Sequence, residues 1–382
     1  MGLSQIRGLG ATYITLIAAF GAWTLLLPVI PLAVVQQGGS ATLAGLHTGV
    51  FMGATVLTQW LMPHALRRFG YVPIMVASAL FLGLPALFYF HSLSLLIALV
   101  RGFGFGGLTV ASSALVAELV RDSKLLGRAL GLSGLCIGGS QVVTLLIGLW
   151  LPFSVVIWLV AIIGVVAAYF ALHIPRIKPQ EAEKTRLLPF TVDALVPAAA
   201  MCFIAMGFGA LSSFLASALA QNETAGQATA GVLLSLLTVA SMGARFIAGH
   251  HPRTFFIPAL FLAGIGLVII SVALSLNLNL LPVIIGVLFF GAGFGVVQNE
   301  ALLLLFDRCP KPEASSIWNM SFDGGTGIGS LVLGYFVPFF AYTGAYGAAA
   351  FMAFIAAVIV LMDQTNRRRG GAIESTIETD IE

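Results

Sequence analysis

Apolar segments long enough to cross a lipid bilayer recur from one end of the chain to the other. A spanning helix needs about 20 apolar residues. Only 9% of the residues are charged, against roughly 25% in soluble domains. We therefore predict an all-α membrane protein with twelve transmembrane helices. They lie near residues 10–35, 42–62, 72–90, 95–117, 127–150, 153–172, 193–218, 226–247, 255–275, 281–305, 315–339 and 344–362.

The basic residues predict the orientation of these helices. Cytoplasmic loops of membrane proteins carry an excess of Lys and Arg. If the N-terminus is cytoplasmic, the outer connections contain no basic residue, and Arg101 is the one of the 18 that does not fall on the inner side. We expect a multi-pass protein of the plasma (inner) membrane with both termini in the cytoplasm.

Sequence similarities between the two parts of the chain predict an internal repeat. Gly104-Phe105-Gly106 recurs 189 residues later as Gly293-Phe294-Gly295. The stretch "GGSQVVTLLIG" at 138–148 resembles "GGTGIGSLVLG" at 324–334, 186 residues later. Two repeats of six helices are the architecture of many secondary transporters, with a substrate site between the repeats.

A polar, Pro- and Glu-containing stretch divides the repeats and gives the domain boundaries. A second polar stretch, after Asp363, has a composition typical of disorder. We predict an N-terminal six-helix half (1–172), a cytoplasmic linker (173–190), a C-terminal six-helix half (191–362) and a disordered cytoplasmic tail (363–382).

The topology and the repeat resemble the major facilitator superfamily over nearly the whole chain. In the loop "PHALRRFGYVP" (63–73), Arg68-Phe69-Gly70 match the family signature, whereas Arg67 stands where the family usually has Asp. The start of the fourth helix, "RGFGFGG" (101–107), is similar to an Arg-and-glycine motif linked to proton coupling in many members.

Two further motifs carry the resemblance. The segment "AELVRDSKLLGRALG" (117–131) is similar to the family's connection between helices four and five. The antiporter signature of helix five is half present, with its paired glycines at 138–139 and without its proline. Among subgroups, the chain looks most like the drug and sugar efflux-type permeases.

Three residues are candidates for proton coupling: Asp323, Glu300 and Arg101. A carboxylate deep in a bilayer costs several kcal/mol when unpaired, and loss of water favours the neutral form of a carboxyl group. Membrane-embedded acids are therefore natural proton carriers. The alternatives are that Asp323 is a structural hydrogen-bonding group between helices, that Glu300 pairs with a basic group, and that Arg101 anchors helix four to helix one.

Polar and aromatic residues on the predicted helices form a candidate substrate cavity. A mostly apolar cavity with one or two acids favours an amphipathic, cationic or zwitterionic solute. The cavity residues are Trp23, Thr24, Ser133, Gln141, Ser212, Ser213, Gln298, Asn299, Trp318, Asn319 and Phe322. Charges at helix ends are candidate gate residues: Arg68, Glu118, Arg128, Arg245 and Asp307.

The leading hypothesis is a secondary active transporter that exports a small organic solute by proton-coupled alternating access. The first alternative is an uptake symporter or facilitator for a sugar, amino acid or carboxylate. A lipid-handling or sensor membrane protein is an alternative of another class. We expect a monomer whose partners are its small-molecule substrate, protons and the lipid bilayer.

Several other classes of protein are disfavoured. The sequence has no Ser/His/Asp, Cys/His or metal-ligand pattern, so we expect neither an enzyme nor a bound cofactor or metal. It has no basic stripe with interleaved aromatic residues, so we expect no nucleic-acid partner.

Overall fold

The regular structure of the protein is helical throughout the part that the structure describes. The computed structural model describes residues 5–89, 93–120, 123–177, 192–221, 225–249 and 255–379. Most of the predicted linker at 173–190 therefore lies outside the described residues. The elements are α1 (Leu9–Leu26), α2 (Val29–Gln36), α3 (Ala41–Phe69), α4 (Tyr71–Gly83), η2 (Leu84–Phe88), α5 (Ser94–Leu119), α6 (Ser123–Gly148), α7 (Phe153–Ala171), η3 (Val192–Ala194), α8 (Leu195–Gln221), α9 (Gln227–Ala248), α10 (Phe256–Ser275), α11 (Leu280–Arg308) and α12 (Lys311–Thr379).

The first predicted span is a kinked helix. Together α1 and α2 make one apolar stretch of 28 residues, Leu9–Gln36. Pro28 separates them, because proline has no backbone N–H and its ring clashes with the preceding turn. The kink lies just over one turn beyond Trp23, whose carbonyl accepts the hydrogen bond of the cap residue Leu27.

The element α12 contains two spans. It is interrupted at Ala341, whose φ of 55° and ψ of −177° are not helical. Before this break the helix packs against α3 and α8; after it, Thr343 accepts a hydrogen bond from Ser271 of α10 at 2.8 Å. Eleven elements of the described chain are long and apolar enough to cross a membrane, and the last of them comprises both stretches. The prediction of twelve spanning helices is thereby confirmed.

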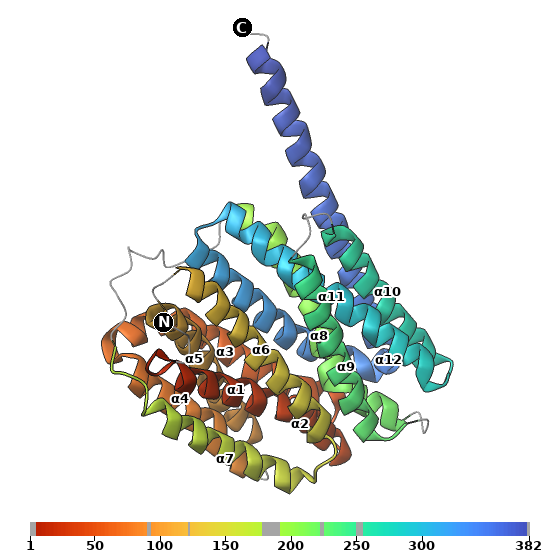
Figure 1. The fold of residues 1–382 in the computed structure, drawn as a ribbon. Coiled ribbons are helices and arrows are strands. Elements are labelled where there is room, and N and C mark those ends of the chain that lie inside the picture. Colours follow the sequence, from red (N-terminus) through yellow and green to blue (C-terminus); the bar gives the residue numbers. More distant parts are fainter. Residues whose placement is uncertain are drawn as a thin grey trace.

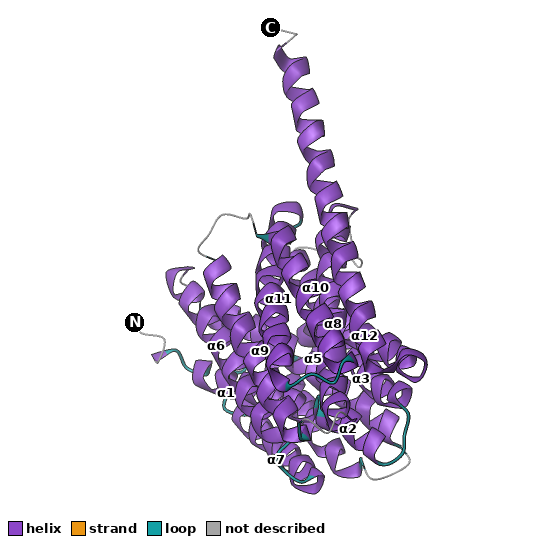
Figure 2. Ribbon diagram, turned by 90° about the vertical axis from the view of Figure 1, so that its right-hand side faces the viewer, coloured by secondary structure: helices purple, strands orange, loops and turns teal. Residues whose placement is uncertain are grey.

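The prediction of a disordered tail after Asp363 is wrong. The helix continues to Thr379 and projects beyond the bundle (Figures 1 and 2). Its base is held by charged contacts: Asp363 pairs with Arg308 of α11, and Arg367 bonds to both Asp363 and Asp193. A polar composition prevents a segment from building its own core, but it does not prevent the extension of a helix that is already nucleated and anchored.

The spans form two groups (Figure 1). We call α1–α7 the N-terminal half and α8–α12 the C-terminal half. The halves meet along two helix pairs, α3 with the first stretch of α12 and α6 with α9. We call the end of the bundle that carries the α2–α3 connection and Ala341 the far end, and the end that carries the start of α1 and the base of the tail the terminal end.

Glycines allow the first stretch of α12 to pack closely on both neighbours. A Cβ atom at Gly329 would overlap the backbone of Met206 in α8, and one at Gly325 would overlap the backbone of Cys202. On the other side, Gly327 faces Met52 of α3. Small residues at such positions let helix backbones approach in lipid, where dispersion contacts drive association.

A glycine-to-alanine pair on α12 tests this packing. We expect Gly329→Ala to destabilise the protein by about 1–3 kcal/mol, because its methyl group overlaps backbone atoms that cannot move aside. Gly324→Ala is the matched control, since its nearest neighbour, Val56 Cγ2, is 4.0 Å away. Unfolding in mixed micelles measures both variants, and equal stabilities would contradict the packing described.

Candidate functional site

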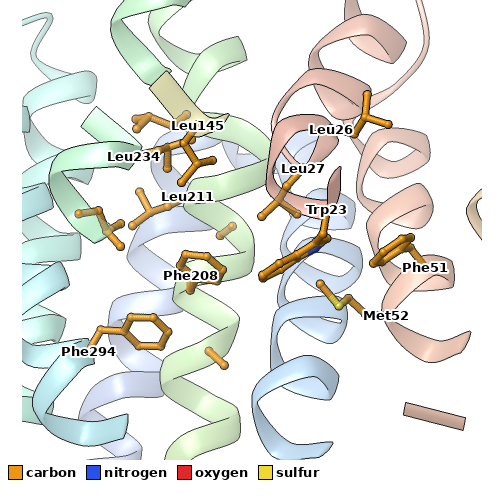
Figure 3. Close-up of a cluster of buried hydrophobic side chains, with 14 of the residues drawn as sticks. Trp23, Leu26, Leu27, Phe51, Met52, Leu145, Phe208, Leu211, Leu234 and Phe294 are labelled. Carbon is orange, nitrogen blue, oxygen red and sulfur yellow. The ribbon is translucent and has the colours of Figure 1, made fainter. Parts of the chain in front are cut away.

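Aromatic rings join the two halves in the middle of the bundle. Trp23 of α1 packs on Phe105 of α5 with ring centroids 4.8 Å apart, and it meets Phe322 of α12 edge-on at 6.5 Å. Phe322 lies 5.8 Å from Phe208 of α8 and stacks on Phe294 of α11 at 6.0 Å. Figure 3 shows Trp23 pointing from α1 toward Phe208 and Phe294. Two predicted cavity residues from opposite halves, Trp23 and Phe322, are thus in contact.

The predicted coupling acid Asp323 lies at the same interface. Its Oδ2 accepts a hydrogen bond from Nε2 of Gln59 in α3 at 2.5 Å, and both side chains are only 5% exposed. Because Gln59 belongs to the N-terminal half, this bond crosses between the halves. It places a buried carboxylate where any relative movement of the halves must change its surroundings.

The Gln59 amide suits both protonation states of Asp323. Its Nε2 donates to the carboxylate, whereas its Oε1 is buried without a hydrogen-bond partner in the described structure. A protonated carboxyl group gains one O–H donor. The orphan Oε1 is the acceptor such a donor requires, so the pair can hold a proton without leaving a second buried group unsatisfied.

An exposed polar side chain lies one turn from Asp323 on the side of the terminal end. Asn319 lies four residues before Asp323 and on the same helical face. Its side chain is exposed and donates to the backbone carbonyl of Ser315 at 2.9 Å. Polar residues therefore lead along α12 from the surface to the buried acid.

A chain of buried hydroxyl groups joins the halves nearer the far end. Thr48 Oγ1 of α3 lies 3.2 Å from Ser213 Oγ of α8, which lies 2.9 Å from Ser330 Oγ of α12. Ser330 also donates to the carbonyl of Gly209 at 3.0 Å. Ser213 was a predicted cavity residue, and the structure places it in the contact that closes the interface.

Further contacts hold the far end together. Gln36 of α2 donates to Gln227 Oε1 at the start of α9 at 2.7 Å. Ser235 of α9 donates to the carbonyl of Val142 in α6 at 2.9 Å, and Gly231 packs on the backbone of the same helix. In this conformation the two halves are closed against each other at the far end.

Arg101 is buried in the N-terminal half and is 2% exposed. It donates to the carbonyls of Leu82 and Ala22 at 2.9 and 3.2 Å and to the Tyr89 hydroxyl at 3.3 Å, and its guanidinium lies 5.5 Å from the ring of Phe51. The bond to Ala22 anchors α5 to α1, as the structural alternative for this residue required. Arg101 also lines a cavity of about 30 Å³, which is room for about one water molecule.

Arg245 belongs to a polar cluster in the C-terminal half. Its Nη1 donates to Gln298 Oε1 at 3.0 Å, and its guanidinium lies 5.3 Å from the ring centroid of Trp318. Trp318 donates to the Gln298 carbonyl at 2.9 Å and stacks on Phe322 at 5.8 Å. The structure thus joins Arg245, a predicted gate residue, to three predicted cavity residues.

The remaining predicted cavity residues do not form a single cluster. Ser133 and Ser212 donate to carbonyls one turn back in their own helices, and Thr24 does so while also contacting Thr144 of α6 at 2.6 Å. Gln141 is half-buried. Asn299 has a buried Nδ2 without a partner in the described structure.

The other predicted charged residues lie at two depths. Glu300 is buried on α11 at 3% exposure. The predicted gate residues lie near helix ends on the terminal side, where Glu118 is half-buried and the others are exposed: Arg68, Arg128 and Asp307.

Sequence reasoning missed the hydrogen-bond partners of Asp323 and Ser213, two of which lie in the other half. Gln59 and Thr48 lie on α3, and Ser330 lies on α12. A signal was present, because Thr48, Thr55 and Gln59 recur at spacings of seven and four residues in an apolar run. Such spacing places them on one face of the helix.

Comparisons with known proteins agree with this architecture. A family model described as Major Facilitator Superfamily matches residues 12–316. A search of curated proteins finds no significant match.

Solved structures of transporters share the fold. The nucleoside transporter NupG is 12% identical with a TM-score of 0.76, covering 93% of this chain and 100% of its own. A D-xylose–proton symporter is 15% identical with a TM-score of 0.73, covering 92% and 95%. A bacterial homologue of the human lysosomal transporter Spinster, in an inward-facing and occupied conformation, is 15% identical with a TM-score of 0.72, covering 94% and 96%.

A double-mutant cycle tests the bond between Gln59 and Asp323. We expect Gln59→Leu to destabilise the protein because it leaves a buried carboxyl group unpaired, and we expect Asp323→Leu to relieve part of that loss. The coupling free energy should be about 1–3 kcal/mol, measured by equilibrium unfolding in mixed micelles.

The matched control for this cycle pairs Asp323→Leu with Thr58→Val. Thr58 lies next to Gln59 on the same helix, but its hydroxyl bonds to the carbonyl of Ala54, 2.7 Å away. These two changes should be additive. Additivity of Gln59→Leu with Asp323→Leu would contradict the cross-half bond.

Proposed function

The chain belongs to the Major Facilitator Superfamily, and on that basis we propose that it exports a small organic solute by proton-coupled alternating access. The observation that carries the proposal is the buried Asp323, bonded across the halves to Gln59. A group whose charge changes, located at the surface where the halves move, is what coupling between a proton and a conformational change requires.

In the proposed cycle, Asp323 takes up a proton when the halves open at the far end and releases it when they open at the terminal end. Deep in the bilayer a neutral acid is less costly than an ionised one. Protonation therefore favours the rocking movement that carries Asp323 through the closed interface. Glu300, buried on the neighbouring α11, is the second candidate for this role.

The proposed orientation gives the described conformation a place in this cycle. Lys and Arg are concentrated on the terminal side, which predicts that this side is cytoplasmic. With the far end closed by Gln36–Gln227 and Thr48–Ser213, the conformation is closed toward the outside of the cell in this orientation. Asn319 then lies on the route by which a proton reaches the cytoplasm.

Aromatic rings support the proposed class of solute. Trp23, Phe208, Phe294 and Phe322 offer apolar faces at the meeting point of the halves. With Asp323 beside them, they favour an amphipathic, cationic or zwitterionic molecule, since aromatic faces and carboxylates both attract cations.

Uptake is the second candidate function. Structural neighbours of the chain include a D-xylose–proton symporter and a nucleoside transporter, so the shared fold is compatible with more than one kind of solute. The direction of transport depends on which gradients the coupling step uses. Counterflow in proteoliposomes, with and without a pH gradient, distinguishes proton-driven transport from a facilitator.

Substitution of the acids tests proton coupling. Once a substrate is found by thermal-stability screening, a proton gradient should accelerate transport by the wild type. Asp323→Asn should retain substrate exchange and lose this acceleration, because an amide cannot carry the proton. Glu300→Gln is the parallel variant. If both variants transport at the wild-type rate and keep its pH dependence, the assignment of proton coupling to these acids is wrong.

Cross-linking the far end tests alternating access. In a background without Cys136, Cys202 and Cys309, Gln36→Cys and Gln227→Cys place two thiols where the amides are now 2.7 Å apart. A short cleavable bismaleimide should arrest transport, and reduction of the linker should restore it. Each single variant serves as control. Undiminished transport by the cross-linked protein would contradict the proposed movement.

A further inference from the structure

We propose that Arg245 binds a carboxylate group of the transported solute, on a platform made by Trp318 and Gln298. The inference rests on the transport role proposed above and narrows its solute to a small amphipathic carboxylate. It changes the expectation from the sequence, in which Arg245 was a gate charge.

The guanidinium of Arg245 has N–H donors that make no hydrogen bond within the described chain. Arginine carries five N–H donors in a rigid fork. Within the described chain its one protein acceptor is Gln298 Oε1, at 3.0 Å, and its other contact is the Trp318 ring. Arg101, by contrast, already uses three of its five donors on two carbonyls and a hydroxyl. An incoming carboxylate could accept from the donors that Arg245 leaves unused, and the parallel N–H groups of a guanidinium favour bidentate binding.

The cluster lies on the face of the C-terminal half that looks toward the other half. The opposite face is covered by α10 and the second stretch of α12, since Gly293 of α11 packs on Ala259 of α10 and Gly264 of α10 packs on Phe354. Arg245 reaches from α9 across α11 to Trp318 on the first stretch of α12. From there the aromatic contacts continue through Phe322 to the N-terminal half.

Surrounding contacts fix the platform in place. Trp318 is held by its N–H bond to the Gln298 carbonyl and by stacking on Phe322. The Gln298 amide is oriented from its other end by a bond from Nε2 to Ser241 Oγ at 3.3 Å. A fixed amide and a fixed ring leave the guanidinium preorganised, which reduces the ordering cost of binding an anion.

Asp323 and Arg245 flank an apolar surface of the C-terminal half. Asp323 faces Gln59 on the α3 side, whereas Arg245 lies on the α9 side, and Phe322 and Trp318 lie between them. A solute with a carboxylate and an apolar or aromatic body fits this order of groups. A solute that also carries an amino group would direct it toward Asp323.

Binding measurements on the purified full chain in detergent test the inference. The probes are phenylacetate, phenylalanine and phenethylamine, which share one ring and differ in charge. At least one of the two carboxylates should raise the apparent unfolding midpoint of the wild type in a concentration-dependent way. Arg245→Gln should weaken its affinity at least about tenfold, because the charge-assisted bonds are lost.

Two further variants make the test specific. Arg176→Gln removes an exposed arginine that follows α7 at the start of the linker, and this variant should bind like the wild type. Arg245→Lys retains the charge without the planar fork, so its affinity should fall between wild type and Arg245→Gln. It also keeps the test informative if Arg245→Gln does not fold.

Two results would overturn the inference: no stabilisation of the wild type by either carboxylate, or equal stabilisation of wild type and Arg245→Gln. Because these measurements need no proton gradient, their failure is distinguishable from a failure of proton coupling at Asp323.

Discussion

The hydrocarbon core of a bilayer offers no hydrogen-bond partner, and every polar group that enters it must find one inside the protein. Backbone groups meet this demand by forming helices. Most buried hydroxyls meet it within their own helix, as Thr58 and Ser212 do with the carbonyls one turn back. A few polar side chains bond to another helix instead, and their hydrogen bonds depend on how the helices pack. Gln59 with Asp323 is the clearest such pair.

Alternating access demands an interface that is closely packed and can still separate. The contact between α3 and α12 meets both needs through small residues, since Gly45 lies against the Ser330 backbone and Gly327 against Met52. Dispersion contacts of this kind have no strong directional bond to break. The polar bonds in the interface are the exception, because each buried group must find a new partner when the halves move. In the proposed cycle, protonation eases that step at Asp323 by removing the charge.

Sequence patterns predicted the helices well and the contacts between them less well. Apolar length identified the spans, including the break at Ala341, because the need to cross a bilayer acts on each segment separately. The Gln59–Asp323 bond joins residues 264 positions apart, and its existence depends on how two helices are rotated against each other. Periodicity placed Thr48 and Gln59 on one face but left open which helix that face meets.

Arg245 illustrates the same limit. Its position near the end of α9 predicted a charge at the gate, whereas its long side chain reaches sideways to Gln298 and Trp318. The side chain of an arginine is long enough to reach a neighbouring helix. The position of Arg245 along α9 therefore does not determine which surface its charged group contacts. The prediction of a disordered tail was wrong for a related reason. Ion pairs to Arg308 and Asp193 anchor a helix that the composition of the tail alone does not predict.

In the proposed scheme, Asp323 and Arg245 give proton and solute a common role. Without its ligands the site would hold an ionised acid at Asp323 and a guanidinium with unused donors at Arg245. Closing the halves over both would desolvate two charges that no contact in the described chain joins directly. Desolvation of an uncompensated ion costs several kcal/mol. A proton on Asp323 removes one of these charges, and a solute carboxylate on Arg245 compensates the other. Each ligand thus lowers the barrier to rocking by the same physical means.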